Sequence, residues 1–491
     1  MIFATVLGLA VIATLGFLGR RRSLNTNSGW AIGDRGMSSL TTFFLQAGAI
    51  FTSFTFLGMS GLTVLGGVSA AYLPAYLVIG YIGMFLLGPI VWKLGKVFNY
   101  HTNADMVGHQ FSSPFLGRLV AFLAVVFFMP IVQVQIVGLG TMVSFGTGYK
   151  QAGTLSMIVA TVLILLFVSW AGLRGVALTA YFKDVAMVVA LVIILIGSLA
   201  TYHAGDVMAD VMTNAEKLLV VSPGTQTYGI VWFVSSVIIS GIGLGAMTLP
   251  ESWPAVLAAN KSRAVSKNHI MLPLYTLATF IPIVLGFFAV SHLQINKGEE
   301  NSAILTLASD SLPGWLMGLV IISGLACAIV PAAHCVLAIA TLVSSNLTPT
   351  GISEERKLLV GRVSSGVILL LSLGLALSRP DLMANLYLLT YAGLAQLAPS
   401  NVLSVTRQKF VNARGLIAGL IVSETVVIVC TFGKIGIFGL NIGVVALVIN
   451  IIVMLAVSAA TGPAVRPAWP QDRGAARPSA NRTPQIADLE A

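Results

Sequence analysis

The chain has 491 residues, of which 57% are apolar and only 9% are charged, and its formal net charge is +10. An ordinary soluble domain carries about 25% charged residues, so a water-soluble globular protein of this size is excluded. The apolar residues form stretches of about 17 to 30, the length at which a helix crosses about 30 Å of hydrocarbon. The sequence therefore predicts an all-α polytopic membrane protein of about 13 transmembrane helices.

Thirteen spans are expected, in chain order, over residues 2–19, 39–66, 70–92, 118–148, 152–172, 177–203, 226–249, 270–292, 313–345, 358–378, 383–398, 415–433 and 436–460. We expect these to group into an extra N-terminal span with its cytoplasmic loop (1–38), a first five-helix repeat (39–203), a second five-helix repeat (204–400), two extra C-terminal spans (401–460) and a disordered cytoplasmic tail (461–491).

The distribution of basic residues predicts the orientation of the chain. Cytoplasmic loops of membrane proteins collect Lys and Arg. With the N-terminus outside, all of the 27 basic residues, Lys183 included, are assigned to the cytoplasmic side except Lys150, Lys217, Lys297, Arg379 and Lys434. The C-terminus is then cytoplasmic, and the positive charge needs no nucleic acid to explain it.

Two predicted spans are interrupted by small residues. The second contains Gly48, Gly58 and Gly61, and the seventh runs through a GIGLG segment (241–245) into Pro250. They lie five spans apart, and repeats of odd length insert with opposite orientation. This arrangement is typical of inverted-repeat transporters, whose site is built from broken helices at the midplane. The alternative is that the glycines only permit close helix packing.

Six motifs in order carry a resemblance to a known family: WAIGDR (30–35), FLGMSG (56–61), NADMVGHQFSS (103–113), MPIVQVQIVGLG (129–140), GLRGVALTAYFKD (172–184) and GLAQLAPS (393–400). With them the chain resembles the sodium:solute symporter family, and within it the bacterial branch that includes monocarboxylate permeases. The resemblance implies inverted five-helix repeats whose first helix is broken. It also implies a secondary active transporter of the bacterial inner membrane that works by alternating access and imports a small organic solute, best a monocarboxylate.

The resemblance further implies how a coupling ion would be held. Sodium-binding members use backbone carbonyls of the first core helix and carbonyl and hydroxyl oxygens of the eighth. The matching positions here are Gly48, Phe51, Ala328, Pro331 and Ala332. Pro331 and Ala332 stand where two hydroxyls are expected, so the coupling ion is left open between sodium and a proton. His334 could carry a proton or pair with a carboxylate, although a buried neutral His is the commoner case.

For the solute, the resemblance implies contacts from Thr52, Ser53, Thr55 and Gln135. Two aromatic residues of other core helices are further candidates: Trp232 could line the site and Tyr391 could close it. Gln135 could instead hold helices together through hydrogen bonds. No arginine is expected at the midplane to bind a carboxylate in a bidentate way, which favours a small organic monoanion.

Other polar residues receive structural assignments. Arg35, Arg174 and Asp184 are expected at cytoplasmic helix ends, in salt bridges that stabilise one state of a gate. Glu424 is taken as the only acid well inside a span, and either a transport role or an oligomer contact fits it. Cys327, Cys335 and Cys430 fall inside spans, which predicts packing residues rather than disulfides or a zinc site.

Two other functions remain open at this point. One is a sodium-coupled amino-acid or vitamin symporter of the same fold, and the other, of a different class, is a membrane sensor or scaffold protein. An enzyme is not expected, because the sequence has no HExxH, no P-loop and no clustered carboxylates. No cofactor is predicted besides the coupling ion.

Overall fold

The computed structural model describes residues 2–18, 26–148, 150–349, 351–378, 383–406 and 408–467. Regular structure in these ranges is helical throughout. Within them, eight helical stretches are long and apolar enough to cross a membrane, and four shorter apolar helices accompany them. The predicted class, a polytopic helical membrane protein, is confirmed. Most of the predicted tail, from residue 468 onward, lies outside the described residues.

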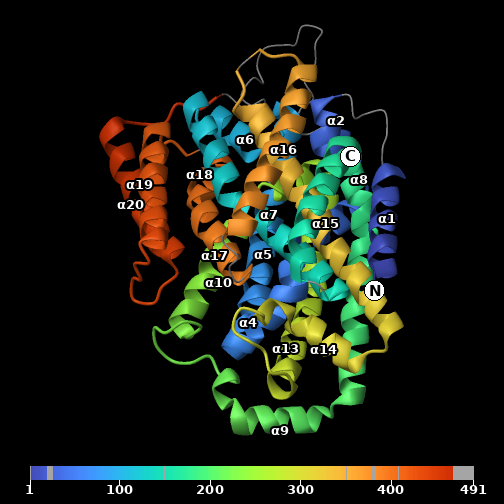
Figure 1. Cartoon of the computed structure of the whole chain (residues 1–491). Helices are drawn as coiled ribbons and strands as arrows, with labels where there is room; N and C mark the ends of the chain where they lie inside the picture. Colours follow the sequence, from blue (N-terminus) through green and yellow to red (C-terminus); the bar gives the residue numbers. More distant parts are fainter. Residues whose placement is uncertain are drawn as a thin grey trace.

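The principal helices pack side by side along one direction (Figure 1). Their bounds are α1 Ile2–Leu18, α3 Ser39–Ile50, α4 Met59–Gly66, α5 Tyr72–Phe98, α7 Pro114–Thr147, α8 Lys150–Thr201, α10 Ile230–Gly245, α11 Ser252–Leu257, α12 Ser262–Tyr275, α13 Phe280–His292, α15 Gly314–Asn346, α16 Glu354–Ser378, α17 Met383–Leu394, α19 Ala413–Phe432 and α20 Ile442–Thr461. Short helices connect them: α2 Asn27–Ile32, α6 Asn103–Gln110, α9 Ala204–Asn214, α14 Ala303–Ser311 and α18 Ala398–Ser404.

The first predicted interruption is present in the second span. Helix α3 ends at Ile50, and the chain resumes as a π-helical turn over Phe54–Gly58 before α4. Phe51 takes an extended conformation, with φ −86° and ψ 91°. The last carbonyls of α3 therefore have no partner within their own helix. One of them, that of Ile50, accepts a hydrogen bond of 2.6 Å from the Thr55 hydroxyl across the break.

The second interruption separates α10 from α11. The chain turns through residues 246–251, where Met247 has a φ of 54°. The side-chain amide of Asn401 donates to the carbonyls of Ala246 and Met247, at 3.0 and 2.9 Å. The indole of Trp253 also donates to the Met247 carbonyl, at 2.8 Å. Both repeats thus begin with a broken helix, as predicted.

Two helices form the centre of the bundle. In α15 and α7, 83% and 72% of the most apolar window are buried. Both pack on α8, which bends at Gly172 and joins the predicted fifth and sixth spans into one element. Gly172 takes φ 56° and ψ −166°, a combination that only glycine adopts without strain.

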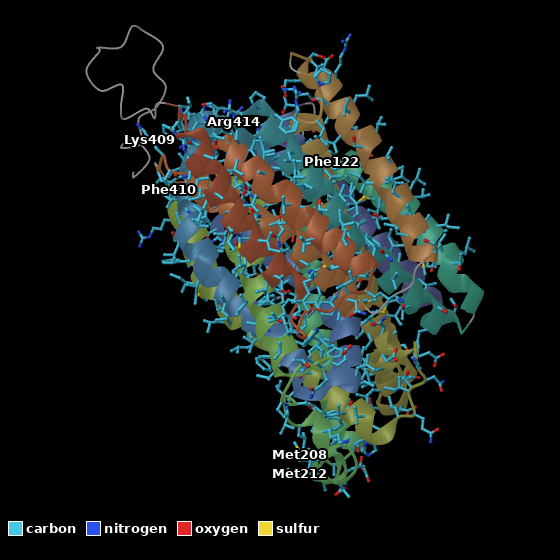
Figure 2. All side chains as sticks on the ribbon, turned by 90° about the vertical axis from the view of Figure 1, so that its left-hand side faces the viewer. Phe122, Met208, Met212, Lys409, Phe410 and Arg414 are labelled. Atoms are coloured by element: carbon cyan, nitrogen blue, oxygen red, sulfur yellow. The ribbon has the colours of Figure 1, made fainter. Side chains whose placement is uncertain are left out.

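The exposed side chains of the outer helices are largely apolar. Figure 2 shows Lys409 and Arg414 at one end of the bundle, and Met208 and Met212 of α9 at the opposite end. Phe122, which Figure 2 places nearer to Lys409 and Arg414, has 55% of its surface exposed, and many Leu, Ile and Val side chains of the outer helices are exposed too. A surface of this kind is what lipid-facing helices require, because hydrocarbon replaces water as the solvent.

Candidate functional site

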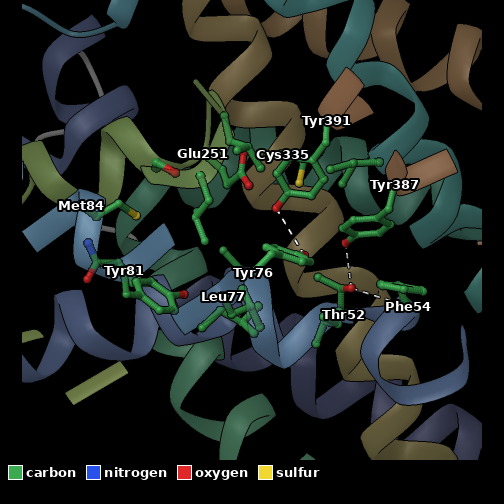
Figure 3. A pocket seen from close by; sticks show the side chains of 18 of the residues that line it. Thr52, Phe54, Tyr76, Leu77, Tyr81, Met84, Glu251, Cys335, Tyr387 and Tyr391 are labelled. Carbon is green, nitrogen blue, oxygen red and sulfur yellow. Dashed lines mark hydrogen bonds between the residues drawn. The ribbon is translucent and has the colours of Figure 1, made fainter. Parts of the chain in front are cut away.

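A cavity lies where the two broken helices meet α5, α15 and α17 (Figure 3). It has about 50 Å³ of free space, which is enough for a few water molecules. Its walls are mostly aliphatic and aromatic. Its polar side chains are those of Gln46, Thr52, Tyr76, Tyr81, Glu251, Ser252, Tyr387 and Tyr391.

Tyrosine hydroxyls form one wall of the cavity. The hydroxyl of Tyr387 hydrogen-bonds to that of Thr52 at 2.9 Å, and the hydroxyl of Tyr391 donates to that of Tyr76 at 3.3 Å. The ring of Phe54 stacks on Tyr387 with 4.6 Å between centroids. These pairs connect the first broken helix and α5 to α17, so a solute in the cavity would contact groups from both repeats (Figure 3).

Glu251 is the charged residue of this cavity, and sequence reasoning overlooked it. It lies in the break between α10 and α11, is 7% exposed, and is drawn in Figure 3 beside Cys335 and Tyr391. Its Oε2 atom has no hydrogen-bond partner among the described residues. Its position directly after Pro250, in the segment predicted to unwind, was the signal that could have identified it.

The six predicted solute contacts separate into two groups. Thr52 and Tyr391 line the cavity. Ser53, Thr55, Gln135 and Trp232 are not among the lining residues. Gln135 accepts a hydrogen bond of 3.1 Å from the backbone N–H of Ser53, so it connects α7 to the first break. Trp232 packs edge to face against Tyr72 and Tyr228, with 5.4 and 5.0 Å between ring centroids.

The backbone carbonyls of Gly48 and Phe51, which were expected to hold a coupling ion, contact a positively charged side chain of the protein itself. The ammonium group of Lys183 donates to the carbonyl of Gly48 at 2.8 Å and to that of Phe51 at 2.6 Å. It also forms an ion pair with Asp184, with 2.7 Å between Nζ and Oδ1. Both side chains of this pair are fully buried.

Two assignments from the sequence are therefore wrong. Lys183 is not a residue of a cytoplasmic loop, and Asp184 is not at a helix end; both lie in the body of α8. Glu424 is consequently not the only acid well inside a span. The error arose because counting basic residues assigns each Lys to the nearest loop. A lysine that is paired with a carboxylate can instead be buried inside the bundle, where its charge is neutralised.

The eighth core helix, α15, passes next to this pair. Ala328, Pro331 and Ala332 are all buried there. His334 is 2% exposed, its Nε2 atom has no partner among the described residues, and it is not among the lining residues, whereas the adjacent Cys335 is. Cys327 and His334 both interact electrostatically with Lys183.

The remaining predicted polar residues bind backbone groups or lie buried. Arg35 donates to the carbonyl of Tyr100 at 2.8 Å, and Arg174 to that of Gly33 at 3.0 Å, so the bonds described for them go to carbonyls instead of the expected carboxylates. Burial lowers the pKa of Arg35 to about 10. Glu424 is 4% exposed within the chain, which leaves little of it for an oligomer contact.

The chain is similar to known transport proteins over most of its length. The sodium:solute symporter family matches residues 30–423. An uncharacterized symporter of Bacillus subtilis (strain 168) is 28% identical over 88% of this chain and 91% of its own length. A monocarboxylate transport permease protein of Rhizobium johnstonii is 27% identical over 83% of this chain and 84% of its own. The sodium/proline symporter of Escherichia coli (strain K12) is 22% identical over 89% of each.

Solved structures share the fold. A Na⁺-coupled sialic acid symporter in a substrate-bound outward-open state has a TM-score of 0.78 at 15% identity, over 95% of this chain and 98% of that one. A nucleobase-cation-symport-1 family transporter has a TM-score of 0.54 at 14% identity, over 90% of this chain and 95% of that one. With the family match covering most of its length and two broken helices around a central cavity, the chain belongs to the sodium:solute symporter family.

Proposed function

We propose that this protein is an ion-coupled symporter that imports a small organic monocarboxylate by alternating access. The observation that carries the substrate class is the relative named as a monocarboxylate transport permease protein, which is similar over most of both chains. The cavity between the two broken helices, with about 50 Å³ of free space, is compatible with a small solute of this class.

The cavity offers hydroxyl donors to a carboxylate and no positive side chain. Thr52, Tyr76, Tyr387 and Tyr391 present their hydroxyls there, and no Lys or Arg is among the lining residues. A single carboxylate can be bound by a few hydroxyls, whereas a dicarboxylate would leave a second charge unpaired in a buried place. We therefore propose a monoanion.

Glu251 bears on how such an anion would bind. Two carboxylates close together in a buried site cannot both keep their charge, so one of them takes a proton. The groups that face Glu251 are Tyr76 and Tyr81 on α5, Cys335 on α15 and Tyr387 and Tyr391 on α17, and none of them is a cation. In our proposal the monocarboxylate and a proton enter the cavity together.

One observation favours a second candidate, an amino acid. The Oε2 atom of Glu251 has no hydrogen-bond partner among the described residues and could accept from the ammonium group of a zwitterion. The similarity to a sodium/proline symporter, at 22% identity, is compatible with such a solute. The two candidates differ in one respect: a zwitterion needs Glu251 charged, and a monocarboxylate needs the site to be protonated.

The test is uptake into proteoliposomes of the full-length protein. Labelled acetate, pyruvate, lactate and proline are offered, with sodium and proton gradients imposed separately. Accumulation of a monocarboxylate driven by an inward proton gradient supports the first candidate. Uptake of proline without uptake of any of the three acids would replace it by the second, and empty liposomes give the background.

A further inference from the structure

The first break of the bundle contains a cation site made of three oxygens. They are the carbonyls of Gly48 and Phe51 and the carboxylate of Asp184, all within 2.8 Å of Lys183 Nζ. Helices α3 and α8 approach each other closely at Gly48: a Cβ there would stand 3.3 Å from Ala180 Cβ and 3.6 Å from Lys183 Nζ. The freed carbonyls of Gly48 and Phe51 lie next to this contact, within hydrogen-bond distance of the ammonium group.

Sodium does not fit this place while Lys183 occupies it. A hard cation such as calcium binds oxygen ligands at about 2.3–2.6 Å. An ion at that distance from the carbonyls of both Gly48 and Phe51 would overlap the ammonium nitrogen, which stands 2.8 and 2.6 Å from the same two atoms. It would also meet a positive charge in a site from which water is excluded.

Helix α15 lacks side-chain oxygens at the two positions where the resemblance places hydroxyls for sodium. Where hydroxyls are expected on α15, the chain has Pro331 and Ala332, both buried. The titratable groups that face the ion pair are Cys327 and His334 on α15 and Tyr275 on α12. No carboxylate other than Asp184 is among them, so the pair has one positive and one negative charge and needs no further ion to be neutral.

We propose that the ammonium group of Lys183 is a built-in cation that takes the place of sodium between α3, α8 and α15, so that this protein does not bind sodium. The inference builds on the proposed symport function, since it states which ion cannot drive it. The pair then holds the first break in a fixed shape during transport, a task that a bound and released ion would otherwise perform in each cycle.

Equilibrium binding of radiolabelled sodium to the purified full-length protein tests this directly, with choline replacing sodium at constant ionic strength. The wild type is expected to bind none. A variant that removes the ammonium group and adds a hydroxyl, Lys183→Ala with Ala332→Ser, is expected to bind about one sodium ion per chain, because the three oxygens are then free to coordinate it. Adding Asp184→Asn to that variant is expected to abolish the binding.

Controls separate the possible failures. Lys267→Ala removes an exposed lysine of α12 and should leave sodium binding at the wild-type level. Size-exclusion chromatography shows whether each variant is folded, and the wild-type measurement stands even where a variant is not. Sodium binding by the wild type would overturn the proposal, and so would a folded Lys183→Ala/Ala332→Ser variant that binds none. Because no solute is present, this result is independent of the uptake test of the proposed substrate.

Discussion

The two broken helices satisfy their freed carbonyls in different ways. At the first break, the carbonyls of Gly48 and Phe51 accept from a charged group, the ammonium of Lys183. At the second break, the carbonyls of Ala246 and Met247 accept from neutral groups: the amide of Asn401 bonds both, and the indole of Trp253 bonds that of Met247. Both repeats thus contain a broken helix with freed carbonyls, but only at the first break is the donor to these carbonyls a buried charged group.

The difference has a consequence for transport. At the first break the charge is paired with Asp184 and fully buried, so it is not available to a solute. At the second break the ionisable group is the carboxyl of Glu251, which lines the cavity and has an oxygen without a partner among the described residues. In our proposal the first break therefore keeps its conformation during transport. The second break carries the group, Glu251, whose protonation changes when a solute binds.

The largest effect is expected from Asp184→Asn, which leaves the ammonium group of Lys183 buried without its counter-charge. Breaking a buried ion pair from one side costs about 3–5 kcal/mol of the free energy of unfolding. We expect a marked fall in the melting temperature of the protein in detergent and loss of transport. Lys183→Met combined with Asp184→Asn should recover much of the stability. If Asp184→Asn alone were as stable as the wild type, the stability of the first break would not depend on the charge of this pair.

At the second break, Asn401→Ala should have a smaller effect. It removes two hydrogen bonds between neutral groups and leaves the Ala246 carbonyl without the Asn401 amide, at a cost of about 1–3 kcal/mol. The Met247 carbonyl keeps its bond from Trp253. The melting temperature should fall less than for Asp184→Asn, measured under the same conditions. An equal fall in both variants would remove the distinction between a charged and a neutral break.

Glu251→Gln tests whether the carboxyl at the second break carries the proton, since glutamine mimics a permanently protonated carboxyl. One proton moved with each solute supports an about tenfold accumulation for a pH gradient of one unit, or about 1.4 kcal/mol. In proteoliposomes the variant should lose this accumulation and still exchange labelled for unlabelled monocarboxylate across the membrane. Glu424→Gln, at a buried acid outside the cavity, is the matched control and should keep the accumulation. Proton-driven accumulation by Glu251→Gln would exclude Glu251 as the proton carrier.

Sequence reasoning predicted the fold well, because span length and broken helices follow from hydropathy and from the positions of Gly and Pro. The interruptions near Gly48 and before Pro250 are both present. Gly48 and Phe51 were also assigned to a cation site, and their carbonyls do contact a cation. What the pattern does not contain is the distant partner of a freed carbonyl: Lys183 bonds the carbonyls of Gly48 and Phe51, and Asn401 bonds those of Ala246 and Met247, each from more than a hundred residues away.

The misassigned ion pair and the predicted solute contacts that lie outside the cavity lining have separate physical reasons. Lys183 and Asp184 are adjacent in sequence, and adjacent residues of a helix usually do not face each other, so a buried pair was not expected. Gln135 and Trp232 are polar or aromatic residues on core helices, and hydropathy does not tell whether such a side chain faces the cavity or a neighbouring helix. The structure places Gln135 against the backbone of Ser53, and it places Trp232 against Tyr72 and Tyr228.

The smallest effect is expected from Tyr387→Phe, in which one hydroxyl of the cavity wall is lost. Its bond to Thr52 is worth about 1 kcal/mol, while the stacking of its ring on Phe54 is retained. Because this hydroxyl joins the first break to α17 next to the solute, the change should weaken solute affinity a few-fold and leave the melting temperature nearly unchanged. Competition by unlabelled monocarboxylate during uptake measures the affinity. Tyr202→Phe, outside the cavity, should behave as the wild type, and an equal loss in both would show that the Thr52–Tyr387 pair does not contact the solute.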